Sequence, residues 1–136
     1  EHGLSNVSFC GYQTGEPLAT LVREARFIVV PSECYENNPM SIIEAYAIGT
    51  PVIGAHIGGV PEIVPEGVTG FRFESRNADD LRVKLAAAAH LSADEYAAMQ
   101  RAALAFAREH FNTENYYPRL IAFYNRCITN PSPHRP

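Results

Sequence analysis

Two spacings of hydrophobic residues organise this chain. Short, continuous apolar runs predict strands, and longer stretches with apolar residues three or four positions apart predict helices. The expected strands cover residues 7–10, 27–30, 51–55 and 71–73. The expected helices cover residues 16–25, 39–48, 60–64, 78–90, 93–109 and 113–128. This alternation predicts an α/β fold, a Rossmann-like parallel sheet flanked by helices, with a helical C-terminal end.

Proline, asparagine and glycine mark the ends of the expected helix at residues 39–48. Asn38 is a suitable N-cap and Pro39 a suitable first helical residue, because proline lacks the amide that a first turn leaves unpaired. Gly49 is expected to end the helix in the left-handed conformation. The strand at residues 27–30 is apolar throughout, which is typical of a parallel strand covered on both faces.

In a parallel sheet every strand ends at the same edge, and open α/β sheets bind their ligands there. The segments that follow the first three expected strands are Gly11, residues 36–41 and the pair Gly58-Gly59. We therefore expect these three segments to converge at one edge of the sheet.

The composition limits the classes of function. The chain has 136 residues, is 46% apolar and has a net charge of −4, with Lys84 as its lysine, so a nucleic-acid partner is not expected. No apolar stretch is long enough to span a bilayer. Three widely spaced cysteines, Cys10, Cys34 and Cys127, favour a reducing compartment, and each is expected to be a small buried side chain.

The start of the helix at residues 39–48 is a candidate anion site. The amides of its first turn lack partners inside the helix and favour a phosphate, although an Asn38 cap and water would satisfy them equally well. Glu36, before this helix, is either a partner for the helix dipole or an acceptor for sugar hydroxyls. Glu44, inside the helix, either faces solvent or accepts the hydroxyls of a ribose.

The remaining polar candidates carry weaker signals. Gly58-Gly59 makes either a simple turn or a place where the backbone approaches a ligand closely. His56 is expected to be an ordinary loop residue. Asp79 and Asp80 open a helix, where capping explains them better than a metal does, and no metal site is expected.

Several motifs together resemble one known family over residues 3–128. They are Leu4 to Gly11, Pro31-Ser32, Glu36 to Ala45, Gly49 to Ile53, Gly58-Gly59 with Glu62 to Val64, and Gly67 to Gly70. The chain resembles the C-terminal, donor-binding domain of the group 1 retaining glycosyltransferases of the GT-B fold. Glu36 and Glu44 fall on that family's E-x7-E motif.

The resemblance implies a role for each matching position. Glu36 would be catalytic and would contact the donor sugar, and Glu44 would hold the ribose. Asn37, Asn38, Pro39, Met40 and Ser41 would bind the donor near its sugar and diphosphate, with Gly58 and Gly59 beside the phosphates. Gly11, Tyr12 and Gln13 would lie near the base. The donor would be a nucleotide-sugar (NDP-sugar), used without a metal or another cofactor.

The resemblance also implies a longer protein. Residues 1–129 would be an N-terminally truncated donor domain and residues 130–136 a flexible tail. A missing N-terminal domain would bind the acceptor, a polysaccharide or a glycolipid, so this fragment is expected to be inactive alone. The truncated sheet edge would favour self-association. The expected location is the cytoplasm or, for the longer protein, the cytoplasmic face of the membrane. The alternatives are a non-catalytic nucleotide- or partner-binding module and a GT-B-type nucleotide-sugar epimerase.

Overall fold

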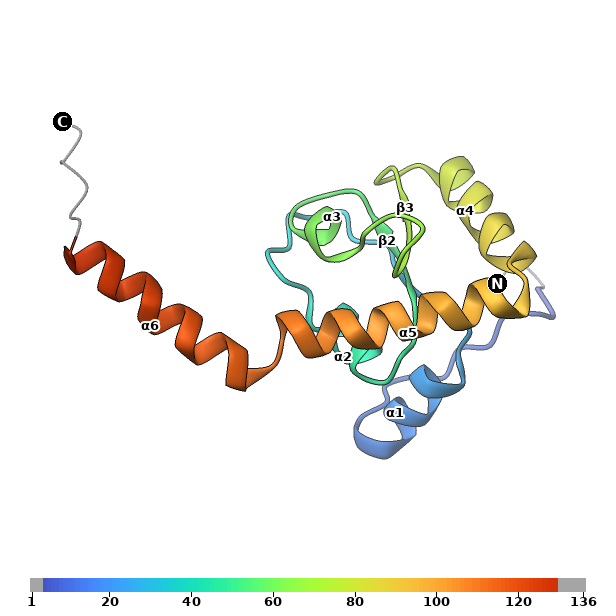
Figure 1. The fold of residues 1–136 in the computed structure, drawn as a ribbon. Helices are drawn as coiled ribbons and strands as arrows, with labels where there is room; N and C mark the ends of the chain where they lie inside the picture. The colour runs from blue at the N-terminus through green and yellow to red at the C-terminus, as the bar shows by residue number, and fades with distance from the viewer. Residues whose placement is uncertain (1–3, 130–136) are drawn as a thin grey trace.

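The computed structural model describes residues 4–129, which form an α/β fold around a parallel sheet (Figure 1). The strands are β1 (Ile28–Val30), β2 (Val52–Ala55) and β3 (Gly70–Phe73), and the sheet has the order β1-β2-β3. Val29 pairs with Ile53, and Ile53 pairs with Phe71. The predicted parallel α/β class is confirmed.

Six helices surround or extend this sheet in the described residues. They are α1 (Gly15–Glu24), α2 (Met40–Ala47), α3 (Val60–Ile63), α4 (Ala78–His90), α5 (Ala93–His110) and α6 (Thr113–Thr129). Each overlaps a predicted helix to within one or two residues at either end. Figure 1 shows α5 running across one side of the domain and α6 extending away from its body.

Apolar side chains cover the sheet on two faces, because successive residues of a strand point to opposite sides. On one face Val30 and Val52 pack with residues of α2 and α5, among them Ile42 and Ala103. On the other face Ile53, Ala55 and Phe73 pack with Ala88 of α4. The face with α2 carries the larger cluster, so α2 is fixed firmly against the sheet.

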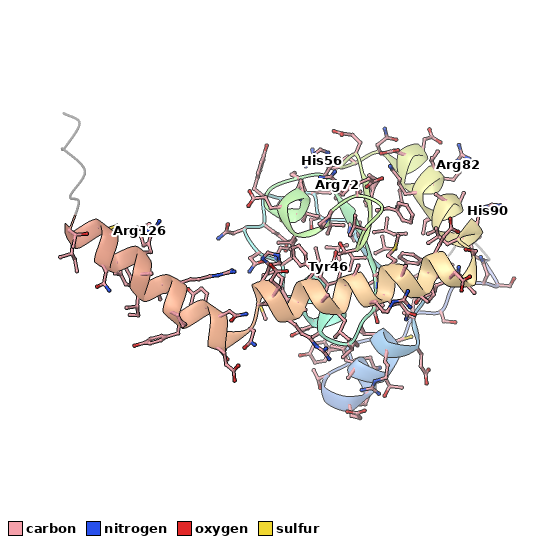
Figure 2. The ribbon with its side chains drawn as sticks, viewed as in Figure 1. Tyr46, His56, Arg72, Arg82, His90 and Arg126 are labelled. Carbon is pink, nitrogen blue, oxygen red and sulfur yellow. The ribbon has the colours of Figure 1, made fainter. Side chains whose placement is uncertain are left out.

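Tyr46 fastens α2 to its surroundings. Its side chain is fully buried, and its hydroxyl is hydrogen-bonded to Thr69 Oγ1 over 2.6 Å. Its ring meets Phe106 edge-on, with 5.9 Å between the ring centroids, and Figure 2 shows it beside α5. Burial raises the pKa of Tyr46 to about 12, so the hydroxyl stays protonated at neutral pH and keeps this bond. Tyr46 therefore joins α2 to both α5 and the segment before β3.

The end of α2 follows the prediction, but its start does not. Gly49 has a φ of +79°, and the amides of Gly49 and Thr50 donate to the carbonyls of Tyr46 and Ala45, which is a Schellman ending. The predicted N-cap at Asn38 is wrong by one residue. Pro39 is the N-cap, with extended dihedral angles and no side-chain cap bond, and its carbonyl accepts from the Ile42 amide.

The predicted strand at residues 7–10 is also wrong. These residues form no regular element, and the Phe9 side chain is 96% exposed. A strand requires a neighbour for its backbone hydrogen bonds, and the described sheet pairs β1 with β2 and β2 with β3 only. The expected self-association stays a prediction, and exposed apolar side chains such as Val7 and Phe9 support it.

Two further expectations about burial differ from the structure. Val29 in β1 is 37% exposed, although both faces of this strand were expected to be covered. The helix on the same face of the sheet as Val29 is α4. It packs against β3, at the other edge of the sheet, and leaves β1 uncovered on this face. Cys10, Cys34 and Cys127 are free and exposed instead of buried, because they lie in the N-terminal segment, the β1 loop and α6, outside both apolar clusters.

Candidate functional site

The loop between β1 and α2 carries Glu36 at the carboxyl edge of the sheet. The Ser32 hydroxyl donates to Glu36 Oε1 and orients this half-buried carboxylate. The start of the loop is tied to the segment after β3, because Ser75 Oγ donates to the Ser32 carbonyl over 3.0 Å. Arg76 Nε lies 3.2 Å from Glu33 Oε2, which adds an exposed ion pair between the same two segments.

The loop after β2 meets this Glu36 loop. The Gly59 amide donates to the Glu36 carbonyl over 2.7 Å. The predicted convergence of the segments around Glu36 and Gly58-Gly59 is therefore confirmed. His56 is exposed in the same loop, its amide donates to the Phe73 carbonyl, and Figure 2 shows it beside α3.

The N-terminus of α2 follows directly. No side chain caps it, and no acidic residue occupies its first turn. The Ile42 amide is engaged by the Pro39 carbonyl, so the amides of Met40 and Ser41 are the candidates for a ligand. Both residues are exposed. An uncapped helix start of this kind presents amide donors and a positive dipole end, which suits an anion such as a phosphate.

Glu44 lies one turn further along α2 and borders a cleft between α2 and α1. The cleft has a volume of about 390 Å³, which is within the range of small-ligand pockets. It is lined by Gly15, Leu18, Ala19, Val22, Glu44, Ala47 and Ile48. A carboxylate on the rim of an otherwise apolar cleft can fix the hydroxyls of a ligand that lays an apolar face inside.

The two glutamates have different surroundings. Glu36 contacts Ser32 and the β2 loop, whereas Glu44 lies beside α1. Within residues 4–129 no hydrogen bond or ion pair joins their carboxylates. A ligand that touched both carboxylates would extend along the start of α2.

The predicted base-binding residues lie in the segment before α1. Tyr12 is 92% exposed, and Gln13 Nε2 donates to the Cys10 carbonyl over 2.6 Å. In the described part of the chain, no hydrogen bond or ion pair links Gly11, Tyr12 or Gln13 to the Glu36 loop. They directly precede Gly15, however, which lines the cleft beside Glu44. Their role stays a prediction.

Ser32 is a site residue that the sequence did not single out as such. It lies two residues after β1 and four before Glu36, so the turn of the loop brings its hydroxyl to the carboxylate. A serine at a strand end, followed by a loop acid, is the signal that could have found it.

Neither a metal-ligating cluster nor a membrane-spanning helix occurs within residues 4–129. No group of three or more His, Cys, Asp and Glu side chains there could hold a metal ion. No helix in that range is long and apolar enough to cross a membrane.

A parallel α/β sheet with a carboxylate loop and an uncapped helix start at its carboxyl edge has the architecture of a Rossmann-like domain, the class that binds its ligands at this edge. A family model described as "Glycosyl transferases group 1" matches residues 1–90. The chain belongs to this family.

Named relatives agree with the assignment. The chain is 38% identical over 129 residues to a D-inositol 3-phosphate glycosyltransferase from Mycobacterium avium, covering 94% of this chain and 30% of that protein. A glycosyltransferase structure from Rickettsia africae is 25% identical with a TM-score of 0.75, covering 88% of this chain and 32% of that one. Anabaena Alr3699/HepE, solved in complex with UDP and glucose, has the same fold at 24% identity, with a TM-score of 0.77 over 90% of this chain and 33% of that one. The chain thus spans about a third of the length of these relatives.

Proposed function

We propose that this chain is the nucleotide-sugar-binding part of a longer retaining glycosyltransferase. The enzyme would transfer a hexose from an NDP-sugar to a polysaccharide or glycolipid acceptor held by another domain. One observation carries the proposal: the Glu36 carboxylate, the uncapped start of α2 and the Glu44 cleft follow one another along one helix and its preceding loop. Sugar, diphosphate and nucleoside follow one another in the same order in the donor.

Each part of the donor then meets suitable chemistry. Glu36 accepts hydrogen bonds from the sugar hydroxyls, and the segment Asn37 to Ser41 supplies amides near the sugar and the diphosphate. Glu44 accepts hydrogen bonds from the ribose hydroxyls. The cleft between α1 and α2 takes an apolar face of the nucleoside, with Gly11, Tyr12 and Gln13 near the base. UDP is the first nucleotide to test, because Alr3699/HepE was solved with UDP.

The resemblance also supplies the mechanism that we propose. The departing phosphate assists the attack of the acceptor, and the anomeric configuration is retained. The protein holds the donor and stabilises the positive charge that develops on the sugar ring, with Glu36 as the carboxylate closest to that charge.

Transfer by the complete enzyme is expected to survive EDTA, because the start of α2 offers amide donors and a positive dipole end to a phosphate without a metal ion. The enzyme is first freed of bound metal. Its initial rate of transfer is then measured with and without EDTA in the assay. Loss of activity with recovery on adding manganese or magnesium would show that transfer requires a metal ion.

Purified residues 1–136 are expected to show no transfer. A leaving diphosphate develops negative charge, and its stabilisation requires preorganised positive groups. Three basic side chains of β3, α4 and the segment after β3 pair with glutamates outside α2: Lys84 and Arg72 with Glu66, and Arg76 with Glu33. Figure 2 places Arg82 and Arg126 on α4 and α6, away from α2.

The test compares this chain with the complete enzyme on the same UDP-, GDP- and ADP-sugars. We expect the isolated chain to bind the donor without transferring its sugar. We expect the complete enzyme to carry out the transfer. Turnover by the isolated chain would show that it needs no other domain. Donor binding without transfer by the complete enzyme would favour a non-catalytic module.

We place the enzyme in the cytoplasm or at the cytoplasmic face of the membrane. The three cysteines are free and exposed, an arrangement that suits a reducing compartment. No nucleic-acid partner is proposed, since the net charge is −4.

A further inference from the structure

The turn Gly58-Gly59 packs directly on the backbone of the loop that carries Glu36. A Cβ atom at Gly59 would lie 1.9 Å from the Asn37 carbonyl oxygen. A Cβ atom at Gly58 would lie 2.5 Å from the Glu36 carbonyl oxygen and 2.9 Å from the Glu36 nitrogen. Every one of these neighbours is a backbone atom, so no side-chain rotation would relieve the contact. A side chain at either position therefore has to push the loop away.

Glycine is required at position 59 because of the nearby loop backbone, and not because of its own backbone conformation. Gly59 has a φ of −82° and a ψ of −8°, which any residue adopts. Gly67 is the opposite case, with a φ of +73° and no neighbouring atom within 4 Å of an added Cβ. Gly59 is thus explained by its contact with the loop, and Gly67 by its backbone conformation.

The other described interactions of this loop do not involve the backbone of Glu36. Ser75 holds the Ser32 carbonyl, four residues earlier. The Arg76–Glu33 pair has side chains that are 71% and 67% exposed, and such pairs contribute little. Ser32 orients the carboxylate group of Glu36. The Gly59 amide donates a hydrogen bond to the Glu36 carbonyl itself, over 2.7 Å.

We propose that Gly59, with Gly58, is a positioning element that sets how far the Glu36 carboxylate reaches into the donor site. Their backbone approaches the Glu36 loop closely, and their effect on transfer runs through Glu36. This inference rests on the function proposed above. It gives the glycine pair a different role from the phosphate contact that the resemblance implies.

The test is a double-mutant cycle in the complete enzyme, built from Gly59→Ala and Glu36→Ala. Gly59→Ala alone is expected to lower kcat about 10- to 100-fold, because a misplacement of about 1 Å costs that much. The Kd for the free nucleoside diphosphate should stay within about twofold, because the sugar is absent from that ligand. In the Glu36→Ala background, Gly59→Ala should cause no further loss, since the residue it positions is gone.

Gly67→Ala is the control for an added methyl group away from the Glu36 loop: its surroundings are open, and its φ of +73° makes it the more strained of the two backbones. It should leave kcat within about twofold, while thermal unfolding of both variants reports on the fold. A loss in the double mutant equal to the sum of the two single losses would overturn the proposal. So would a Gly59→Ala variant whose Kd for the free diphosphate rises as much as that of Glu44→Ala, which would indicate a direct phosphate contact.

If Gly59→Ala is unfolded at the assay temperature, Gly58→Ala replaces it, because its added Cβ meets a less severe contact. Gly58 has a φ of +58°, so this variant also strains the backbone, and Gly67→Ala, at a φ of +73° and with open surroundings, controls for that strain. Unfolding of both variants would show that the contact supports the whole domain, and the positioning role would be rejected. Failure of the proposed function is recognised separately, since the complete unmutated enzyme would then show no transfer. Transfer that Glu36→Ala leaves unchanged would instead reject the role of Glu36.

Discussion

Replacing Glu44 with alanine in the complete enzyme is expected to weaken binding of the free nucleoside diphosphate by about one to two factors of ten. The loss of a hydrogen bond to a charged group costs about 1.5–3 kcal/mol, and Glu44 is the carboxylate on the rim of the cleft between α1 and α2. The ribose does not react, so the interaction is equally strong before and during transfer. Kd should therefore rise for the nucleotide-sugar and the free diphosphate alike, with little change in kcat at saturation. Isothermal titration with the free diphosphate measures this directly.

Glu109→Ala is a suitable control, because Glu109 is an exposed glutamate on α5, outside the cleft. It should leave the Kd unchanged. An unchanged Kd for Glu44→Ala as well would mean that Glu44 merely faces solvent, as many helical glutamates do.

Most of the fold could be predicted because its elements have strong local signals. The apolar runs of β1 and β2 and the spacing of apolar residues in α4 and α5 are visible in the residues themselves. Gly49 ends α2 as expected, since the left-handed conformation favours glycine. The strand at residues 7–10 failed for a non-local reason: an apolar run is a strand only when another strand pairs with it.

Two of the three predicted segments of the candidate site, the Glu36 loop and the β2 loop, meet as expected, whereas in the described residues no hydrogen bond joins Gly11 to them. The contacts between the two loops were not predicted. The rule that parallel strands end at one edge brings the Glu36 loop to the β2 loop without any knowledge of side chains. It does not show that the Gly59 amide binds the Glu36 carbonyl, or that Ser32 holds the carboxylate. Those contacts depend on the path of two loops, and loop paths have no periodic signal in the sequence.

The start of α2 shows the same limit on a smaller scale. Asn38 and Pro39 are both good helix-start residues. The choice between them depends on the ψ angle of Pro39, which is 117° and therefore outside the helix. This shift of one residue matters for the proposed donor site, because it leaves α2 without a side-chain cap and its first amides open to a ligand.

Glu36→Ala is expected to slow transfer by about one to two factors of ten and to leave the Kd for the free diphosphate nearly unchanged. The donor sugar gains positive charge as its bond to the phosphate breaks. A carboxylate beside it then stabilises the transition state more than the bound substrate, so its loss appears in kcat. The magnitude again corresponds to one lost hydrogen bond to a charged group, about 1.5–3 kcal/mol. Single-turnover kinetics at saturating donor measure the effect without interference from donor binding.

Glu36→Gln separates charge from hydrogen bonding at this position, because glutamine keeps the length of the side chain and one acceptor oxygen. If the negative charge matters, Glu36→Gln should be nearly as slow as Glu36→Ala. If hydroxyl binding alone matters, it should recover much of the rate. A Glu36→Ala variant that weakens the free diphosphate as strongly as Glu44→Ala would contradict the division of roles, since the diphosphate carries no sugar for Glu36 to hold. If neither alanine variant changes Kd or kcat, Glu36 interacts only with the dipole of α2 and Glu44 only with solvent.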